Sequence, residues 1–311
     1  MIINASVKTD IPAFYGAWFM NRIDAGFCLA TNRFNRKNRI ALTRDEVDGF
    51  FFWTKNVGPF MPQLEILTER GYPFVVHYTI TGYPRAIEPA VLPADRAIEQ
   101  MRILREKYGP RAAVWRYDPI AITSLTDFDF HRLNFRRLAE RLAATTDEVC
   151  VSFVNYYPRM KRERDEAARQ RGFEWEDPTA DRKREFIVEL NGIAREHNLK
   201  LSLCAQREYL SPGINDAACV DVQRLSDVAG VEVHGRKPGH RGSVCGCFHA
   251  VDIGAYNTCR HGCAYCYAVQ NNGKACDFFR RHDPAAENLS DGFDDDGEAG
   301  VLDVPDCQLA S

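Results

Sequence analysis

The sequence predicts an α/β fold, specifically a (β/α) barrel that is complete or partial. Short apolar runs rich in β-branched and aromatic residues alternate with helical patterns, which is typical of βα units around a parallel sheet. Eight such runs can be found, and eight strands suit a barrel. The length of 311 residues exceeds the usual single-domain size unless the fold is a sandwich or an α/β barrel.

The expected strands are residues 2–6, 49–54, 74–80, 113–117, 149–154, 199–204, a weak run at 231–234, and 250–256. The expected helices are residues 12–25, 59–70, 95–108 and 129–144. Pro12 suits the first turn of its helix, with Thr9 or Asp10 as the cap. Gly71 and Gly109 are stop signals for the next two helices.

Two segments depart from this alternation. Residues 159–184 are almost wholly charged and read as a solvated helix and loop, with a lid over the site as the alternative. From residue 284 the chain becomes acidic and glycine-rich, so we expect a flexible tail. The sequence therefore predicts one domain over residues 1–283 and a tail over residues 284–311.

The bulk composition excludes several classes of protein. Hydrophobic residues make up 45% and charged residues 27% of the chain, as in ordinary globular proteins, and no apolar run approaches the ~20 residues of a membrane span. The start of the chain does not resemble a leader, so we expect a cytoplasmic protein with no membrane partner. A net charge of −3 argues against a generally basic surface for nucleic acid. The eleven cysteines indicate metal or cluster ligation.

Three of these cysteines, Cys259, Cys263 and Cys266, form a C-x3-C-x2-C loop directly after the last expected strand. Three thiolates on one short loop leave one corner of a four-iron cluster without a protein ligand, and such an open iron can bind a substrate or cosubstrate. The alternative is a zinc loop in which His261 completes the ligand set, with His249 as a spare. A disulfide is a weaker interpretation because nothing suggests secretion.

The loop, with Tyr265 directly before the third cysteine, resembles the signature of the radical S-adenosylmethionine enzymes. The resemblance implies a [4Fe-4S] cluster on Cys259, Cys263 and Cys266. It also implies S-adenosylmethionine on the open iron, cleaved by one electron to a 5′-deoxyadenosyl radical.

Polar residues at the carboxyl ends of the expected strands should gather over one mouth. The candidate catalytic residues are Lys55, Asp118, Arg116 and Asp10, and the candidate cofactor-binding residues are Thr79, Thr81, Gly82, Tyr265 and Asn257. Alternatives remain for several of them: Asp10 suits a helix cap, and Arg116 with Asp118 suits a structural ion pair. Lys55 requires an anionic partner if it is buried, and a carboxylate of S-adenosylmethionine or of the substrate would serve.

Five segments, residues 9–15, 52–56, 81–84, 115–120 and 252–259, resemble domain-of-unknown-function family 1848, over about residues 6–268. That family is noted for a C-terminal cysteine cluster like the N-terminal one of radical S-adenosylmethionine enzymes. If the last strand lies beside the first, the barrel is a circular permutation of the usual order. The chain departs from the family at Lys8, where an arginine is expected.

A second set of cysteines, Cys204, Cys219, Cys245 and Cys247, can fill all four corners of a second cluster or of a zinc site. Cys28 and Cys150 lie in apolar runs and are expected to be buried free thiols, and Cys307 in the tail to be incidental.

Taken together, these patterns favour an oxidoreductase-like iron–sulfur radical enzyme that receives electrons from a flavodoxin or ferredoxin-like donor. The cysteine loop is also similar to that of spore photoproduct lyase, which implies lesion repair or modification of nucleic acid through the basic cluster Arg159, Lys161, Arg162 and Arg164. The third hypothesis is a non-catalytic zinc-binding or electron-transfer protein. Whether the substrate is a small molecule, a peptide or a nucleic acid cannot be read from these residues.

Overall fold

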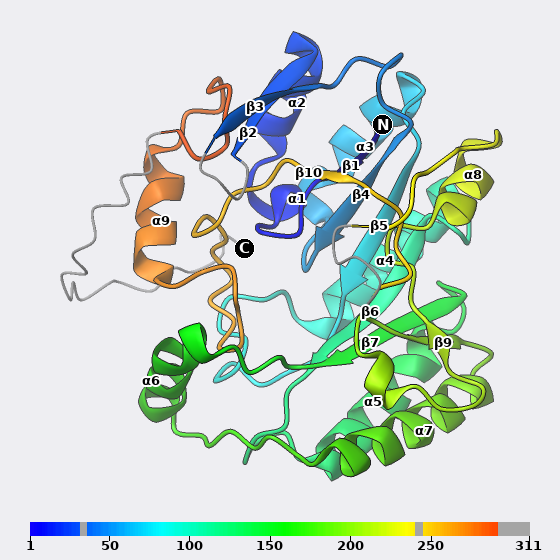
Figure 1. Ribbon diagram of the computed structural model, residues 1–311, viewed down its shortest axis with the longest axis vertical. Helices are drawn as coiled ribbons and strands as arrows, with labels where there is room; N and C mark the ends of the chain where they lie inside the picture. Colours follow the sequence, from blue (N-terminus) through cyan, green and yellow to red (C-terminus); the bar gives the residue numbers. More distant parts are fainter. Residues whose placement is uncertain (32–35, 240–244, 292–311) are drawn as a thin grey trace.

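The computed structural model describes residues 1–31, 36–239 and 245–291, and a large parallel sheet dominates them (Figure 1). Eight strands of the described chain form this sheet in the order β10-β1-β4-β5-β6-β7-β8-β9, and each neighbouring pair is parallel. The strands are β1 Ile2–Asn4, β4 Gly49–Thr54, β5 Phe74–Thr79, β6 Ala113–Ile120, β7 Glu148–Phe153, β8 Lys200–Leu203, β9 Asn215–Asp216 and β10 Val251–Asp252.

The last strand of the sheet lies beside the first, as the permuted order predicts. Ile3 pairs with Val251, and Asn4 with Asp252. The two ends of the strand order are β10 and β9, and no ladder joins them within the described residues. The architecture that the structure supports is therefore an α/β fold with an eight-stranded parallel sheet.

Helices occupy most of the connections between these strands. They are α1 Ile11–Phe14, α2 Gly16–Ala25, α3 Met61–Glu69, α4 Ala94–Tyr108, α5 Phe128–Leu142, α6 Lys161–Arg171, α7 Ala180–Glu196, α8 Val222–Ala229 and α9 Asn272–Arg281. Short 3-10 turns are η1 Gly58–Phe60, η2 Pro158–Met160 and η3 Arg207–Tyr209. In Figure 1, α3, α4, α5 and α7 lie along one face of the sheet, whereas α6 and α9 stand apart from them.

The predicted helix over residues 12–25 is two helices, because Tyr15 leaves the helical conformation between α1 and α2. Its ring is buried, and its hydroxyl donates to the carbonyl of Thr258 at 2.7 Å. This contact ties the start of the chain to the cysteine loop. The helices predicted at 95–108 and 129–144 correspond to α4 and α5.

The strands are buried on both faces, which explains why the sequence shows continuous apolar runs rather than alternation. Phe50, Phe52 and Trp115 pack in the main core with the helices. Phe51 and Val114 point to the opposite face, here called the inner face, where the segment between β9 and β10 covers them. Alternate residues of one strand therefore pack in two different apolar cores, one beneath the helices and one on the inner face.

Two strand predictions need correction, and one of them is the last strand, which was expected over residues 250–256 but is only β10 Val251–Asp252. Residues 231–234 do not form a strand: Val231 is 62% exposed, and Val233 is buried in the inner-face cluster without pairing to the sheet. The strand at that place in the sheet is β9, whose two polar residues carry no apolar pattern. The sequence reasoning also missed an antiparallel hairpin of β2 Phe27–Thr31 and β3 Lys37–Ala41, which lies outside the main sheet.

The segment that begins the expected tail packs against the N-terminal helices. The carbonyls of Pro284, Ala285 and Ala286 accept bonds from Asn21, Arg22 and Trp18, and Leu289 is buried. The packed chain thus extends to residue 291, and the rest of the expected tail, residues 292–311, lies outside the described residues. Among the described helices, none is long and apolar enough to cross a membrane.

Candidate metal centre

The C-x3-C-x2-C loop follows β10 and lies at the carboxyl ends of the strands, here called the mouth of the sheet. Cys259, Cys263 and Cys266 are all partly buried. The chain turns at Gly262, whose φ of +67° is easily adopted only by glycine. Asn257 closes the loop: its amide donates to the carbonyl of Ala268, and its side-chain oxygen accepts from Gln270 N.

The loop is held by segments that are remote in the sequence. Ala264 N donates to the carbonyl of Ile87 at 3.0 Å, and Arg171 of α6 donates to the carbonyl of Gly262 at 3.0 Å. The connection after β5 and helix α6 therefore fix the backbone that carries the three thiols.

His261 lies inside this loop, but it is already bonded on both sides. Its Nε2 is 2.8 Å from Asp10 Oδ2, and its Nδ1 is 3.1 Å from the carbonyl oxygen of Ala90. Each ring nitrogen thus already has an oxygen partner within hydrogen-bond distance. The interpretation of His261 as a zinc ligand is therefore not supported by its contacts.

Asp10 acts both as the helix cap that the sequence allowed and as a brace of the mouth. Its Oδ1 accepts from Ala13 N at 3.0 Å, and its Oδ2 accepts from Lys55 N at 2.7 Å as well as contacting His261. The carboxylate is buried. It joins α1, the end of β4 and the cysteine loop.

Lys55 has an anionic partner within the chain, namely Glu88. Lys55 Nζ and Glu88 Oε1 are 2.8 Å apart, and their side chains are 13% and 3% exposed. Thr81 Oγ1 donates to the other carboxylate oxygen at 2.7 Å, and the hydroxyl of Tyr265 also donates to Glu88. The expectation that a ligand carboxylate neutralises Lys55 is corrected, because Glu88 fills that role.

Charge stabilises this pair against the cost of burial. Burial opposes ionisation of both groups, but their mutual attraction keeps the pKa of Glu88 below its ordinary value and that of Lys55 above its own. Burial raises the pKa of the neighbouring Cys263 thiol to about 12, although Lys55 acts in the opposite direction. A bound metal would deprotonate such a thiol outright.

A cavity of about 700 Å³ opens beside the cysteine loop. Its walls are the loop itself, residues 154–171 including α6, and the beginning of α9. Ala168 of α6 packs in one apolar cluster with Ala264 of the loop. The charged segment thus includes a helix that forms one wall of the cavity.

Acidic neighbours pair with two of the four residues of the predicted basic cluster, Lys161 and Arg164. Lys161 and Arg164 both contact Asp165, and Arg169 contacts Glu166. The side chain of Arg159 lies outside the described residues. Such pairing lowers the positive potential available for phosphates.

The remaining mouth residues divide between two places. Thr79, Thr81 and Gly82 line a smaller cavity of about 300 Å³ between the end of β5 and the beginning of α4, together with Glu88. Gly82 has a φ of +64°, and a Cβ there would stand 2.9 Å from Asn134 Oδ1. Arg116 and Asp118 form the structural ion pair allowed by their spacing, with Arg116 Nε 3.0 Å from Asp118 Oδ2.

These contacts connect the start of the chain, the sheet mouth and the cysteine loop. A single family model matches all three parts. Residues 2–268 match the family described as Domain of unknown function (DUF1848). The chain belongs to this family. The matched region runs from β1 past Cys266, so the DUF1848 region contains both the sheet and the loop. No curated protein matches the chain at a significant level.

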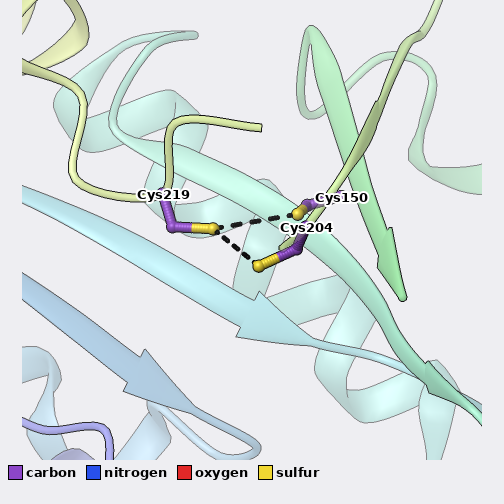
Figure 2. A group of neighbouring side chains, drawn as sticks. All are labelled: Cys150, Cys204 and Cys219. Atoms are coloured by element: carbon purple, nitrogen blue, oxygen red, sulfur yellow. Dashed lines mark hydrogen bonds between the residues drawn. The ribbon is translucent and has the colours of Figure 1, made fainter. Parts of the chain in front are cut away.

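The DUF1848 chain carries a second group of thiols on the inner face of its sheet (Figure 2). Cys150 of β7, Cys204 just after β8 and Cys219 after β9 lie with all sulfur atoms within 4.8 Å of one another. Among the described residues this is the one set of three potential ligands that is so compact. Cys247 is adjacent, since its sulfur accepts from Cys219 N at 3.1 Å, and Cys245 contacts Cys247.

Three functional candidates escaped the sequence reasoning. Glu88 was missed as the partner of Lys55 because 33 positions separate them in the sequence, and His261 was missed as the partner of Asp10 because 251 positions separate that pair. Cys150 is a buried free thiol, as expected, but its place in the thiol group was not foreseen: it lies in register with Arg116 on β6 and Ser202 on β8. Residues two apart on a strand point to the same face, so Cys204 lies on the same side of the sheet as Ser202, the register partner of Cys150. This alternation is a signal that could have placed Cys150 near Cys204.

Proposed function

We propose that this DUF1848 protein is an iron–sulfur enzyme of the radical S-adenosylmethionine type, with its cluster on Cys259, Cys263 and Cys266. The observation that carries the proposal is the loop itself: it offers three thiols beside a large cavity, while its histidine is occupied by Asp10 and Ala90. Three ligands suit a four-iron cluster with one open corner.

The spacing of the thiols also favours a cluster over a single zinc ion. Four thiolates at about 2.3 Å from one ion stand about 3.8 Å apart. Among the residues that the structure describes, only the inner-face group is compact enough to meet a 4.8 Å limit, so the three loop thiols are wider apart. In a cluster each thiolate binds a different iron, which requires such wider spacing.

When bound, the cluster would supply the electron that cleaves S-adenosylmethionine to a radical able to take a hydrogen atom from an unreactive carbon. The chain's own residues hold the loop in place. Tyr265 anchors it to Glu88, Asp10 holds the ring of His261, and Arg171 donates to the backbone carbonyl of Gly262. Lys55 places a positive charge near the Cys263 thiol, which favours the thiolate.

Helix α6 would shield the reaction from water. It forms one wall of the cavity, and its apolar residue Ala168 packs with Ala264 on the loop. Exclusion of water protects a reactive intermediate from side reactions. The substrate would enter between α6 and α9, and the electron would come from a flavodoxin or ferredoxin-like donor.

The test is anaerobic purification of the full chain with iron and sulfide analysis, followed by reduction with dithionite in the presence of S-adenosylmethionine. We expect a brown protein that releases 5′-deoxyadenosine. Cys263→Ala should abolish this release, whereas Cys28→Ala, a buried thiol on β2, should retain it. A colourless protein, or a Cys263→Ala variant as active as its parent, would reject the proposal.

A further inference from the structure

The inner-face thiols differ from the loop thiols in spacing, and this difference indicates a different kind of site. The sulfur of Cys219 lies 3.4 Å from that of Cys204 and 4.0 Å from that of Cys150 (Figure 2). Thiolates around a single tetrahedral ion are expected about 3.8 Å apart, since each metal–sulfur bond is about 2.3 Å. The observed distances bracket this value and are far too long for a disulfide, whose sulfurs are about 2.05 Å apart.

A fourth sulfur lies next to Cys219. Cys247 Sγ accepts a hydrogen bond from Cys219 N at 3.1 Å, which places it next to Cys219, although it does not lie within 4.8 Å of all three other sulfur atoms. Cys219 and Cys247 are also buried. Three thiols therefore converge from β7, the end of β8 and the segment after β9, and Cys247 of the same segment is the fourth candidate ligand. Thiolates are the donors that soft or borderline metal ions prefer.

The surroundings are built to hold a charged sulfur centre. Arg116, which is only 4% exposed, donates to Cys219 Sγ at 3.1 Å, and this cation offsets part of the negative charge of the thiolates. His77 Nε2 donates to the carbonyl of Cys219 at 2.7 Å and stacks on Trp53. Partners of this kind orient metal ligands from outside the coordination sphere.

We propose that Cys150, Cys204, Cys219 and Cys247 bind one tetrahedral metal ion, Zn²⁺ or Fe²⁺, in a closed structural site. The ion would tie the segment between β9 and β10 to the strands β7 and β8, whose inner face that segment covers. It closes all four positions with thiolates, so it has no open position for substrate. This site is independent of the loop cluster and of the proposed radical chemistry.

The test uses the full chain in which Cys259, Cys263 and Cys266 are replaced together by alanine, so that iron on the loop cannot contribute. We expect about one equivalent of zinc or iron per chain by elemental analysis. X-ray absorption should show a single shell of sulfur at about 2.3 Å and no metal–metal shell. Replacement of the ion by Co²⁺ should give the spectrum of a tetrahedral tetrathiolate complex.

Variants in the same background assign the ligands. Cys219→Ala and Cys204→Ala should lower the bound metal at least tenfold, whereas Cys28→Ala should leave it unchanged. Cys247→Ala should also lose the ion, and Cys245→Ala should keep it. The Co²⁺ and absorption measurements need no folded variant of these four cysteines, so they remain decisive if Cys219→Ala does not fold.

Three outcomes would overturn the inference. A metal-free chain in which peptide mapping finds a disulfide between Cys204 and Cys219 would show an oxidised pair instead of a metal site. A short metal–metal shell would show a polynuclear cluster. Loss of the ion in Cys245→Ala with retention in Cys247→Ala would refute the assigned ligand set. None of these results depends on whether S-adenosylmethionine is cleaved.

Discussion

Replacement of Glu88 by glutamine is the most direct test of the charge arrangement at the mouth. The substitution keeps the shape of the side chain and an oxygen that can accept from Lys55 and Tyr265, but it removes the negative charge. The ammonium of Lys55 then stays buried, with its side chain 13% exposed, and has lost the anion 2.8 Å away. Removing one partner of a buried ion pair typically costs about 3–5 kcal/mol.

This cost corresponds to a decrease of about a hundredfold to several thousandfold in the ratio of folded to unfolded protein. Urea denaturation at pH 7, followed by circular dichroism, measures it. The matched control is Glu99→Gln, which removes a helical ion pair with Arg102 whose two side chains are about half exposed. That control should change the free energy of unfolding by less than about 1 kcal/mol.

A double variant separates the charge effect from the loss of a contact. Lys55→Met combined with Glu88→Leu removes both charges, and it should be less destabilised than Glu88→Gln because no unpaired ion remains buried. The folded pKa of Glu88 is below its ordinary value of 4.5, so its contribution is complete above that pH and is lost as the pH falls through the folded value. If Glu88→Gln is as stable at pH 7 as Glu99→Gln, the ion pair does not stabilise the mouth and the reasoning is wrong.

Three further predictions concern other parts of the site and the core. Gly82→Ala should destabilise the fold by about 1–3 kcal/mol in urea denaturation, because of its positive φ and blocked Cβ position, whereas Gly192→Ala in α7, with open space around it, should be neutral or stabilising. Asp10→Asn should lower the iron content of anaerobically purified protein, since the amide cannot accept equally from Lys55 N and the ring of His261; unchanged iron would show that the brace is not needed. Burial lowers the pKa of His131 to about 4, so the free energy of unfolding should fall by about 3 kcal/mol as the pH drops from about 6.5 to 4. This pH dependence should weaken in His131→Gln, and an identical profile would contradict the reasoning.

Much of the fold follows from local patterns. The apolar runs at residues 49–54, 74–80 and 149–154 correspond to β4, β5 and β7, because strands buried on both faces must be continuously apolar. The two-residue strand β9 has too few residues for any periodicity. Val231 and Val233, in contrast, belong to a run that pairs with no strand: Val231 is 62% exposed, and Val233 packs in the inner-face cluster as part of the covering segment.

The site divides in a similar way. The spacing of Cys259, Cys263 and Cys266 is local, so the sequence could place these three thiols on one loop by itself. It could also show that a lysine at the end of β4 needs a buried anion, but not which one. A ligand carboxylate and Glu88 satisfy that requirement equally well in the sequence, and only the path of the chain after β5 brings Glu88 to 2.8 Å from Lys55.

The sequence by itself determined the parallel α/β class, the cysteine loop after the last strand and the chemistry that such a loop allows. The tertiary structure alone decided that β10 lies beside β1 and that Cys150 joins Cys204 and Cys219. It also decided that the two ring nitrogens of His261 contact Asp10 and the carbonyl of Ala90. The physical reason is the range of the interactions. Periodicity and motif spacing report contacts within one turn or strand, whereas ion pairs and converging thiols depend on segments that only the folded chain brings together.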